Sequence, residues 1–254
     1  MKISVIIPVL NQEKYIKQSI DSVLSQKNCN FECIVVDGGS SDGTINILKK
    51  YQDKRLIWKS EKDNGLSNAV NKGLKKASGN IVTFLGSDDY FYSNDVLHKI
   101  DKYFSSHPKS KCINANYCIV DSFGNKIQSY VIWYKAILRN LPFQNFLLGI
   151  TNFIIQPATF WRRELMMEVG LFDENLKYCM DYDYWLRITK ITKINMINSC
   201  VVNYRIHSNS NRGSSYKKLF VEDIQVVRKY YKNWLVINLH KLHNKFIVFI
   251  YKRI

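Results

Sequence analysis

The stretch FECIVVDGGSSDGT, residues 31–44, contains the repeating unit that indicates the fold. Its first half, Phe31–Val36, is a run of apolar and β-branched residues typical of a buried strand. Asp42 or Ser41 can then cap a helix over Gly43–Tyr51, because short oxygen-bearing side chains satisfy the free amides of a first helical turn. A strand followed directly by a helix is the unit from which parallel α/β sheets are built.

The same alternation continues on both sides of that stretch. Apolar runs typical of strands occupy Ile3–Val9, Leu56–Lys59 and Ile81–Leu85. Apolar residues at helical spacing cover Glu13–Gln26 and Leu66–Ala77. This order predicts βαβ units and a mostly parallel sheet flanked by helices. Because a chain of 254 residues with 46% hydrophobic residues can bury one core, we expect a single catalytic unit with an appendage.

The order of elements changes in the second part of the chain. A helix is expected near Asn94–Phe104, followed by two strand-like runs, Cys112–Val120 and Lys126–Trp133, with a turn signal between them. These two runs predict a hairpin beside the sheet. The remaining expected elements are a strand near Phe153–Trp161, a helix near Arg163–Val169, a helix from about Asp181 to Thr189 and a strand near Ile194–Tyr204.

Basic residues exceed acidic ones, and the excess is greatest near the end of the chain. The 37 Lys and Arg against 21 Asp and Glu give a formal net charge of +16, which favours an anionic partner such as nucleic acid, anionic lipid or a phosphorylated substrate. From Arg205 onward there are eleven Lys or Arg against only Glu222 and Asp223. Charge alone does not choose among these partners.

The first residues and the cysteines bear on the cellular compartment. The segment MKISVIIPVLN contains Pro8 and lacks the long apolar region and cleavage site of a signal peptide. No uncharged apolar stretch reaches the ~18 residues that span a bilayer. The six cysteines form no CxxC pair, as expected in a reducing compartment. We therefore expect a cytoplasmic protein that does not span the membrane.

Residues 213–254 are expected to form a basic, aromatic-rich helical extension. Tyr216–Leu235 carries apolar side chains at helical spacing, with Lys and Arg between them. One interpretation is a helix packed on its own domain. The other is an element that lies on an anionic membrane surface, since basic flanks with Trp, Tyr and Phe suit the headgroup region. The segment KLHNKFIVFIYKRI, residues 241–254, favours the second interpretation.

Acidic residues follow three of the predicted strands. These are Asp37, Asp63 and the adjacent pair Asp88 and Asp89. Ligands of open α/β sheets bind beyond the carboxyl ends of the strands, so these acids predict a binding site there. No GxGxxG phosphate cradle follows the first strand. The charge of a diphosphate must then be met by a metal, and Asp88 and Asp89 supply hard oxygen ligands for Mg²⁺ or Mn²⁺.

Four blocks together carry a specific resemblance. In order, they are IPVLNQEKYIKQSIDSVLSQ (7–26), FECIVVDGGSSDGT (31–44), EKDNGLSNAVNKGLKKASGNIVTFLGSDD (61–89) and QPATFWRRELMMEVGLFDENLKYCMDYDYWLR (156–187). Over roughly residues 1–210 the chain resembles glycosyltransferase family 2, with the Rossmann-like GT-A fold. The resemblance implies a catalytic domain over 1–212. Within it, residues 1–110 would bind the nucleotide-sugar and residues 111–212 would bind the acceptor and supply the catalytic base.

The resemblance also assigns the donor side. Asp37 resembles the family's uracil-binding acid, and Asp63 resembles its second nucleotide-contacting acid. Pro8 and Glu13 lie where donor-binding residues of the first loop are found.

The metal and diphosphate residues follow from the same resemblance. Asp88 is expected near the ribose and Asp89 on the metal. In the block YRIHSNSNR, residues 204–212, His207 can face the metal or the diphosphate. Arg205 and Arg212 flank it and could neutralise the leaving diphosphate, because guanidinium presents a fork of donors to phosphate.

The block MDYDYWLR, residues 180–187, resembles the family's ED motif, in which an aspartate takes the acceptor proton. By that alignment the base is Asp181, and Met180 stands where the motif has glutamate. Asp183 is the alternative, although it points about 200° away around a helix. Gln156 and Arg162–Arg163 resemble an acceptor-side element.

The resemblance implies an inverting, metal-dependent transfer by one displacement, with Asp181 as base. UDP is inferred from Asp37. The basic extension fits a lipid-linked saccharide acceptor for a cell-surface polymer, at the inner face of the membrane, and the predicted hairpin offers a docking place. A nucleotidyltransferase and a membrane-associated scaffold with a lapsed active site are the alternatives. A nucleic-acid-binding module is not expected, because the strand-end acids would repel phosphate.

Overall fold

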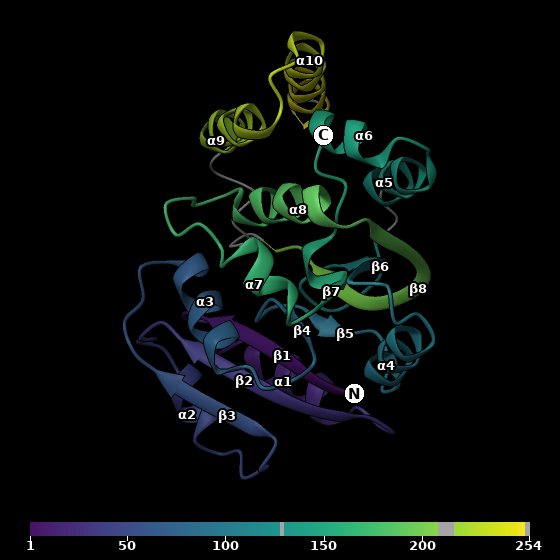
Figure 1. The fold of residues 1–254 in the computed structure, drawn as a ribbon. Coiled ribbons are helices and arrows are strands. Elements are labelled where there is room, and N and C mark those ends of the chain that lie inside the picture. Colours follow the sequence, from purple (N-terminus) through teal and green to yellow (C-terminus); the bar gives the residue numbers. More distant parts are fainter. Residues whose placement is uncertain (128–129, 208–215, 252–254) are drawn as a thin grey trace.

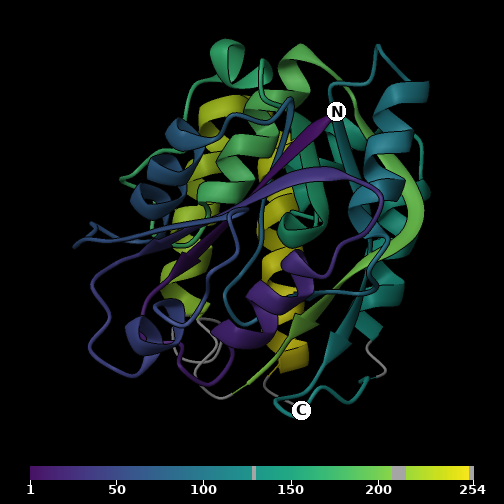
Figure 2. The ribbon, with the colours of Figure 1, turned by 90° about the horizontal axis from the view of Figure 1, so that it is seen from below.

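One sheet runs through the protein, and the computed structural model describes it over residues 1–127, 130–207 and 216–251 (Figure 1). In this part of the chain, eight strands pair in the order β3-β2-β1-β4-β7-β6-β8-β5. Helices lie on both faces of the sheet (Figures 1 and 2). The strands are β1 (Lys2–Val9), β2 (Asn30–Asp37), β3 (Leu56–Ser60), β4 (Ile81–Phe84), β5 (Tyr90–Phe91), β6 (Cys112–Val120), β7 (Thr159–Arg162) and β8 (Ile194–Arg205).

The first half of the sheet is parallel, as the sequence predicted. β1 pairs in parallel with β2 and β4, and β2 pairs in parallel with β3. The register places Val9 opposite Asp37 and Asp37 opposite Ser60, so three strands end at one edge of the sheet. The helices that connect these strands are α1 (Ile16–Leu24), α2 (Thr44–Leu48) and α3 (Leu66–Lys76).

The second half of the sheet is mixed. β7 is antiparallel to both β4 and β6, β6 is parallel to β8, and β5 is antiparallel to β8. The strand expected near Phe153–Trp161 is shorter, because a 3₁₀ helix at Gln156–Ala158 precedes β7. Pro157 favours that break, since proline has no N–H to donate to a strand ladder. The other helices are α4 (Val96–Ser106), α5 (Tyr130–Asn140), α6 (Gln144–Ile150), α7 (Leu165–Val169), α8 (Met180–Ile191), α9 (Tyr216–Tyr230) and α10 (Trp234–Tyr251).

The predicted hairpin is wrong in its second strand. Residues 130–140 form α5, and among the described residues of the expected pairing the bridge between Val120 and Lys126 is what forms. The contacts of Arg139 explain why this segment is helical. Its buried guanidinium donates to Asn116 Oδ1 at 2.6 Å and to the carbonyl oxygen of Asn114 at 2.7 Å. The helix is therefore anchored on β6 by contacts that no local pattern reveals.

Two hydrophobic layers lie on opposite faces of the sheet. Successive side chains of a strand point to opposite faces, so Ile6 of β1 enters one layer while Val5 and Ile7 enter the other. The first layer contains Trp161 and Trp185 and is covered by α3, α7 and α8. The second is covered by α1 and α4. A parallel strand buried on both faces explains the nearly continuous apolar runs in the sequence.

The C-terminal extension forms two helices where the sequence predicted one over Tyr216–Leu235. Val226 and Val227 of α9 are buried in the same layer as α8, and α9 lies on the far side of α8 from the sheet (Figure 1). His240 and Asn244 of α10 are also buried. Among the residues that the structure describes, no helix is both long enough and apolar enough to cross a bilayer.

Candidate active site

Asp37 ends β2 and is fully buried, with 0% of its surface exposed. Its Oδ2 accepts hydrogen bonds from the N–H groups of Gly39 and Ser40, both at 3.0 Å, and from Ser60 Oγ at 2.6 Å. The Ser40 hydroxyl donates to Oδ1. The carboxylate therefore shapes the loop at Gly38–Ser41, and its contact with a uracil stays a prediction.

The loops after β1 and β2 are joined by side-chain contacts. Glu13 Oε2 accepts a hydrogen bond from the N–H of Gly43 at 2.7 Å, and the N–H of Glu13 donates to Asp42 Oδ2 at 3.0 Å. Asn11 Oδ1 accepts from the N–H of Ser41 at 2.8 Å. Glu13 thus holds the two loops together at the edge where a donor is expected.

Asp63 lies against the loop after β2. The N–H of Gly65 donates to Asp63 Oδ1 at 2.8 Å. A Cβ atom at position 38 would come within 2.3 Å of Asp63 Oδ2, so Gly38 leaves room for this carboxylate. Pro8 is buried in β1, opposite Val36, in the sheet beneath these loops. Donor contacts of Asp63 and Pro8 stay predictions.

The acidic pair after β4 meets the end of β8. His207 Nε2 lies 3.1 Å from Asp88 Oδ2, and the N–H of Arg205 donates to Asp89 Oδ1 at 2.8 Å. The ring of Tyr15 packs on His207, with 4.9 Å between the ring centroids. The Asp88 side chain is 25% exposed, whereas Asp89 is buried. The structure therefore brings together the three residues that the sequence predicted for the metal and the ribose.

Arg205 is buried behind that pair. Its guanidinium lies over the rings of Tyr15 and Tyr90, 4.7 and 5.2 Å from their centroids. Nε donates to the carbonyl oxygen of Asp88 at 2.8 Å, and Nη2 donates to Gln18 Oε1 at 2.5 Å. Nη1 reaches two carbonyl oxygens after β6. These contacts fix the wall of the site, and a contact between Arg205 and a diphosphate stays a prediction.

The acidic pair Asp88 and Asp89, together with His207, supplies oxygen and nitrogen atoms of the kind that bind a divalent metal. In the described ranges, no group of three or more His, Cys, Asp or Glu is arranged to hold an ion. A carboxylate and an imidazole 3.1 Å apart still suit an ion that takes one or two protein ligands and completes its shell with substrate phosphate and water. The residues present fit a metal that binds together with a diphosphate.

A cavity of about 210 Å³ lies beside the N-terminus of α8. Asp181, in the first turn of α8, lines it, and so does Gln156, whose Nε2 donates to the carbonyl oxygen of Phe84 at 2.5 Å. Because Phe84 ends β4 and also lines the cavity, the cavity adjoins the strand end that leads to Asp88. The other polar and basic residues in its wall are Lys135, Asn152, Lys177, Tyr117, Tyr178 and Tyr204.

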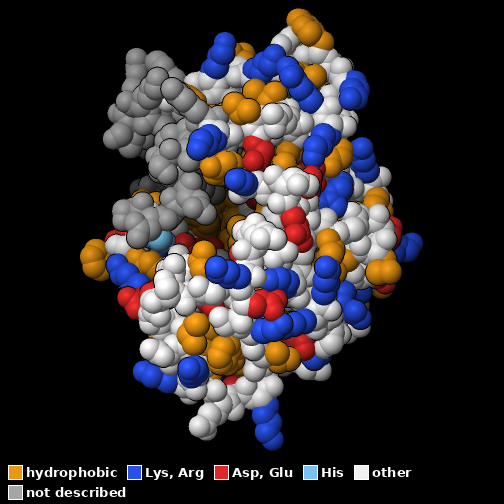
Figure 3. All heavy atoms as spheres, turned by 90° about the vertical axis from the view of Figure 1, so that its left-hand side faces the viewer, with side chains coloured by type: hydrophobic (Ala, Val, Ile, Leu, Met, Phe, Trp, Pro, Cys, Tyr) orange, Lys and Arg blue, Asp and Glu red, His pale blue; other side chains and the backbone are white. Residues whose placement is uncertain are grey.

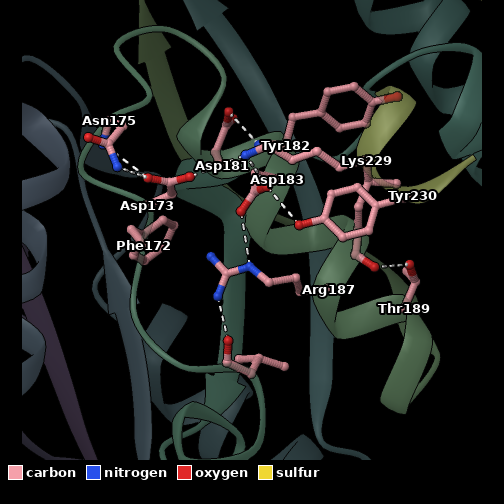
Figure 4. Close-up of polar contacts among 12 residues, drawn as sticks. Phe172, Asp173, Asn175, Asp181, Tyr182, Asp183, Arg187, Thr189, Lys229 and Tyr230 are labelled. Atoms are coloured by element: carbon pink, nitrogen blue, oxygen red, sulfur yellow. Dashed lines mark hydrogen bonds and ion pairs between the residues drawn. The ribbon is translucent and has the colours of Figure 1, made fainter. Parts of the chain in front are cut away.

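Asp181 and Asp183 have different surroundings (Figure 4). Asp183 is 2% exposed and pairs through Oδ2 with Arg187 Nε at 3.0 Å. Its Oδ1 accepts a hydrogen bond from the Tyr230 hydroxyl at 2.7 Å. Burial and this hydrogen bond raise the pKa of Tyr230. Asp181 accepts from the N–H of Tyr182 at 2.7 Å and lines the cavity, so it is the acid of the two that can meet an acceptor.

Arg162 and Arg163 do not lie with Gln156, contrary to the prediction. Arg162 Nε donates to the carbonyl oxygen of Ser110 and Arg163 Nε to that of Gly79, both at 2.9 Å. Both arginines line a separate hollow of about 490 Å³. The reason is strand direction: β7 is antiparallel to β4 and ends opposite Ile81, at the end of β4 away from the acidic pair.

Several residues in the cavity wall were not predicted. Lys135 comes from α5, whose first residues fell in the run predicted as a strand, and Lys177 comes from the turn before α8. Tyr117 and Tyr204 lie on β6 and β8. No spacing in the sequence connects these four elements. Arg212 lies outside the described residues.

Residues 4–170 match the family described as Glycosyl transferase family 2. The chain belongs to glycosyltransferase family 2. This family 2 glycosyltransferase is 28% identical over 218 residues to an uncharacterized glycosyltransferase of Rickettsia prowazekii, a match that covers 85% of the chain and 68% of the relative. It is 32% identical over 213 residues to an uncharacterized glycosyltransferase of Rickettsia conorii, covering 81% of the chain but only 34% of that relative.

A further relative is the PGL/p-HBAD biosynthesis glycosyltransferase of Mycobacterium bovis, 29% identical over 194 residues, with 72% of the chain and 68% of the relative covered. These matches favour a glycosyltransferase over the nucleotidyltransferase and the scaffold that the sequence left open.

Solved structures confirm the predicted GT-A fold of the glycosyltransferase. S. aureus TarS 1–349 in complex with UDP-GlcNAc gives a TM-score of 0.72 at 22% identity and covers 91% of the chain and 66% of TarS 1–349. The mannosyltransferase PcManGT of Pyrobaculum calidifontis, in complex with GDP-Man and Mn²⁺, gives 0.67 at 18% identity, covering 96% of the chain and 68% of PcManGT.

Proposed function

We propose that this glycosyltransferase moves a sugar from a UDP-linked donor to a hydroxyl of a saccharide acceptor, with inversion at the anomeric carbon and with Mn²⁺ or Mg²⁺ as cofactor. The observation that carries the proposal is the position of Asp181 in a cavity that adjoins the strand end leading to Asp88. In this proposal residues 1–110 hold the donor and residues 111–212 hold the acceptor and the base.

The donor occupies the edge where β1, β2 and β3 end. Asp63 contacts the nucleotide, and Glu13 keeps the first two loops in register through its bond to Gly43. Asp37 and Pro8 form the base of the uracil pocket, Asp37 by holding the loop that follows it. The UDP-GlcNAc complex of TarS supports a uridine donor, because the two proteins share this fold.

The diphosphate lies over the acidic pair. Asp88 approaches the ribose, and Asp89 and His207 would hold the metal, whose charge would stabilise the departing diphosphate. Arg205 serves the same group by donating from its side chain to the backbone carbonyl oxygen of Asp88 and from its N–H to the carboxylate of Asp89. The Mn²⁺ in the PcManGT complex supports this cofactor.

Asp181 acts as the general base. Its carboxylate removes the proton from the acceptor hydroxyl while that oxygen attacks the anomeric carbon and the bond to the nucleoside diphosphate breaks. The proton ends on Asp181, and the nucleoside diphosphate leaves. A single displacement inverts the anomeric centre and needs no carboxylate nucleophile.

The acceptor is a lipid-linked saccharide for a surface polysaccharide, met at the inner face of the cell membrane. Exposed basic, apolar and aromatic side chains on the helices of the extension support this, because surfaces that mix them bind the anionic headgroup region of a membrane. Lys and Arg mix with hydrophobic side chains at the level of α9 and α10 (Figure 3). Exposed apolar residues of these two helices and of the neighbouring α5 and α6 include Trp133 and Ile137 on α5, Phe143 and Phe146 at α6, Val221 on α9, and Trp234, Leu235, Leu242 and Phe246 on α10.

A donor screen tests the proposal. Release of nucleotide from UDP-GlcNAc, UDP-glucose and GDP-mannose would be measured with octyl glycosides as acceptors, in Mn²⁺ and in EDTA. We expect nucleotide release from one of the UDP-sugars, and we expect that release to require Mn²⁺ or Mg²⁺. Release that is equally fast in EDTA would contradict the metal, and preference for GDP-mannose would contradict the uridine donor.

A further inference from the structure

Helix α9 of the extension contacts the turn that leads into α8. Glu222 accepts three hydrogen bonds from this turn through its two carboxylate oxygens. Oε1 accepts from the N–H groups of Tyr178 and Cys179, both at 2.8 Å, and Oε2 accepts from the N–H of Lys177 at 3.1 Å. Three consecutive backbone groups of the catalytic domain therefore converge on one side chain of the extension.

Glu222 caps the start of α8, which the side chains of the turn itself do not do. Cys179 is the N-cap of α8 and makes no side-chain capping bond. Successive N–H groups that point to one side form a site for an anion, and a carboxylate at a helix N-terminus also interacts favourably with the helix dipole. Glu222 supplies that anion from another helix, and it fixes the direction in which α8 begins.

A second contact joins the same two helices further along. The Tyr230 hydroxyl of α9 donates to Asp183 Oδ1 of α8 at 2.7 Å (Figure 4). Lys229 Nζ lies 3.2 Å from Asp173 Oδ2, in the segment between α7 and α8. Because Glu222 and Tyr230 lie two turns apart on α9, they hold the start of α8 at two separate points, Glu222 at the turn before the helix and Tyr230 at Asp183.

The turn held by Glu222 is a wall of the cavity. Lys177, Tyr178, Met180 and Asp181 all line it. Asp181 follows Cys179 by two residues, so the direction of its side chain depends on how the turn is held. Met180 stands where the ED motif of the family has glutamate. In this protein, the acidic side chain that binds the turn is Glu222.

We propose that Glu222 is a positioning residue that holds Asp181 in the orientation needed to take the acceptor proton, so that α9 is part of the active site. This inference rests on the proposed function. It gives the extension a catalytic task that is separate from any attachment to a membrane.

The test compares Glu222→Ala and Glu222→Gln with two controls. Gln225→Ala changes an exposed residue of the same helix, and Glu164→Gln removes an exposed negative charge elsewhere. Three quantities would be measured: nucleotide release with the octyl glycosides of the screen, UDP affinity by calorimetry, and hydrogen exchange of the amides of residues 177–179.

Glu222→Ala is expected to lower kcat about 100-fold, since a displacement of about 1 Å costs that much. UDP affinity should stay within about twofold, and the three amides should exchange faster because they lose their acceptor. Glu222→Gln should recover to within about 10-fold of wild type, because its amide oxygen can still accept two of the three bonds. Both controls should match wild type.

Wild-type turnover in Glu222→Ala would overturn the inference, and so would a loss of UDP affinity as large as the loss of turnover, which would indicate a general structural role. A wild-type protein that releases no nucleotide would instead refute the proposed function. In that case, unchanged amide exchange in Glu222→Ala would overturn the contact itself.

Discussion

The hydroxyl of Tyr230 donates a hydrogen bond to Asp183 Oδ1 at 2.7 Å. This bond distinguishes Asp183 from Asp181, the other acid in the first turn of the same helix. Asp183 is buried and joins α8 to α9, whereas Asp181 lines the cavity. A helix turns about 100° per residue, so the two side chains leave α8 on nearly opposite sides. The sequence motif alone does not show which of the two aspartates is buried and which lines the cavity.

Asp181→Asn and Asp183→Asn should therefore fail in different ways. Asp181→Asn removes the base and should lower turnover by about 10²- to 10⁴-fold while the melting temperature stays near that of wild type. Asp183→Asn weakens buried bonds to Arg187 and Tyr230 and should lower the free energy of unfolding by about 1–3 kcal/mol, with a smaller loss of turnover. Nucleotide release and thermal unfolding measure the two effects. A folded Asp183→Asn variant that is less active than Asp181→Asn would reverse the assignment.

His207→Ala should weaken the dependence on metal in a specific way. If His207 and the acidic pair hold the ion, the Mn²⁺ concentration for half-maximal turnover should rise by about 10-fold or more. His98→Ala is the matched control, because His98 is an exposed histidine on α4. A Mn²⁺ titration of nucleotide release measures both variants. Identical titration curves for His207→Ala and wild type would remove His207 from the metal site.

Gly38→Ala should displace Asp63 without unfolding the protein. The new Cβ would come within 2.3 Å of Asp63 Oδ2, and the free end of that side chain can move aside at little cost. We expect UDP affinity to fall by about 10-fold, roughly the loss of one hydrogen bond to a charged group, with only a small change in melting temperature. Calorimetric titration with UDP checks this. Unchanged affinity would show that Asp63 does not contact the nucleotide.

Glu32 should make stability sensitive to acid. Burial pushes its pKa upward, but hydrogen bonds from Lys2, Ser4 and Ser78 outweigh burial and hold the pKa at about 2. The folded protein therefore binds this proton less readily than the unfolded chain, so the stabilisation is present above about pH 4.5 and is lost as the pH falls towards 2.

Glu32→Gln should lower the free energy of unfolding at pH 7 and flatten its pH dependence between about pH 5 and 2. Urea unfolding at a series of pH values measures the slope, with Glu164→Gln as the exposed control. Equal slopes for Glu32→Gln and wild type would contradict the low pKa.

Membrane binding should depend on the exposed face of α10. Replacing Trp234, Leu242 and Phe246 by alanine removes large apolar side chains that are 74%, 64% and 57% exposed. Affinity for vesicles that contain phosphatidylglycerol should fall by about 10-fold or more, and salt should weaken the wild-type interaction. Met167→Ala, at a residue 90% exposed on α7, is the control. Unchanged vesicle binding in the triple variant would place the membrane contact elsewhere or remove it.

The parts of the fold that the sequence predicted correctly depend on local patterns. β1, β2 and β4 are apolar runs, Asp37 ends β2 and Asp88 follows β4, and the βαβ order sets the direction of these strands. The acidic edge of the site was therefore predictable. The resemblance assigned Asp88, Asp89 and His207 to one site, but it paired His207 with Asp89 on the metal and did not predict that His207 would lie 3.1 Å from Asp88.

The parts that were missed depend on contacts between distant segments. Residues 130–134, YVIWY, are apolar and aromatic, and such a short run does not distinguish a strand from a helix. The burial of Arg139 against β6 decides for the helix. In the sequence, Glu222 is one of two acids in a basic segment, and no neighbouring residue indicates Tyr178 or Cys179 as its partners. Its contact with the turn before α8 was therefore not predictable.

The most direct test of the account is the anomeric configuration of the transferred sugar. Wild-type protein with an α-linked UDP-sugar and an octyl glycoside should give a β-linked product by NMR, because Asp181 promotes a single displacement, and Asp181→Asn should give almost none. An α-linked product, or transfer by Asp181→Asn at the wild-type rate, would contradict the mechanism.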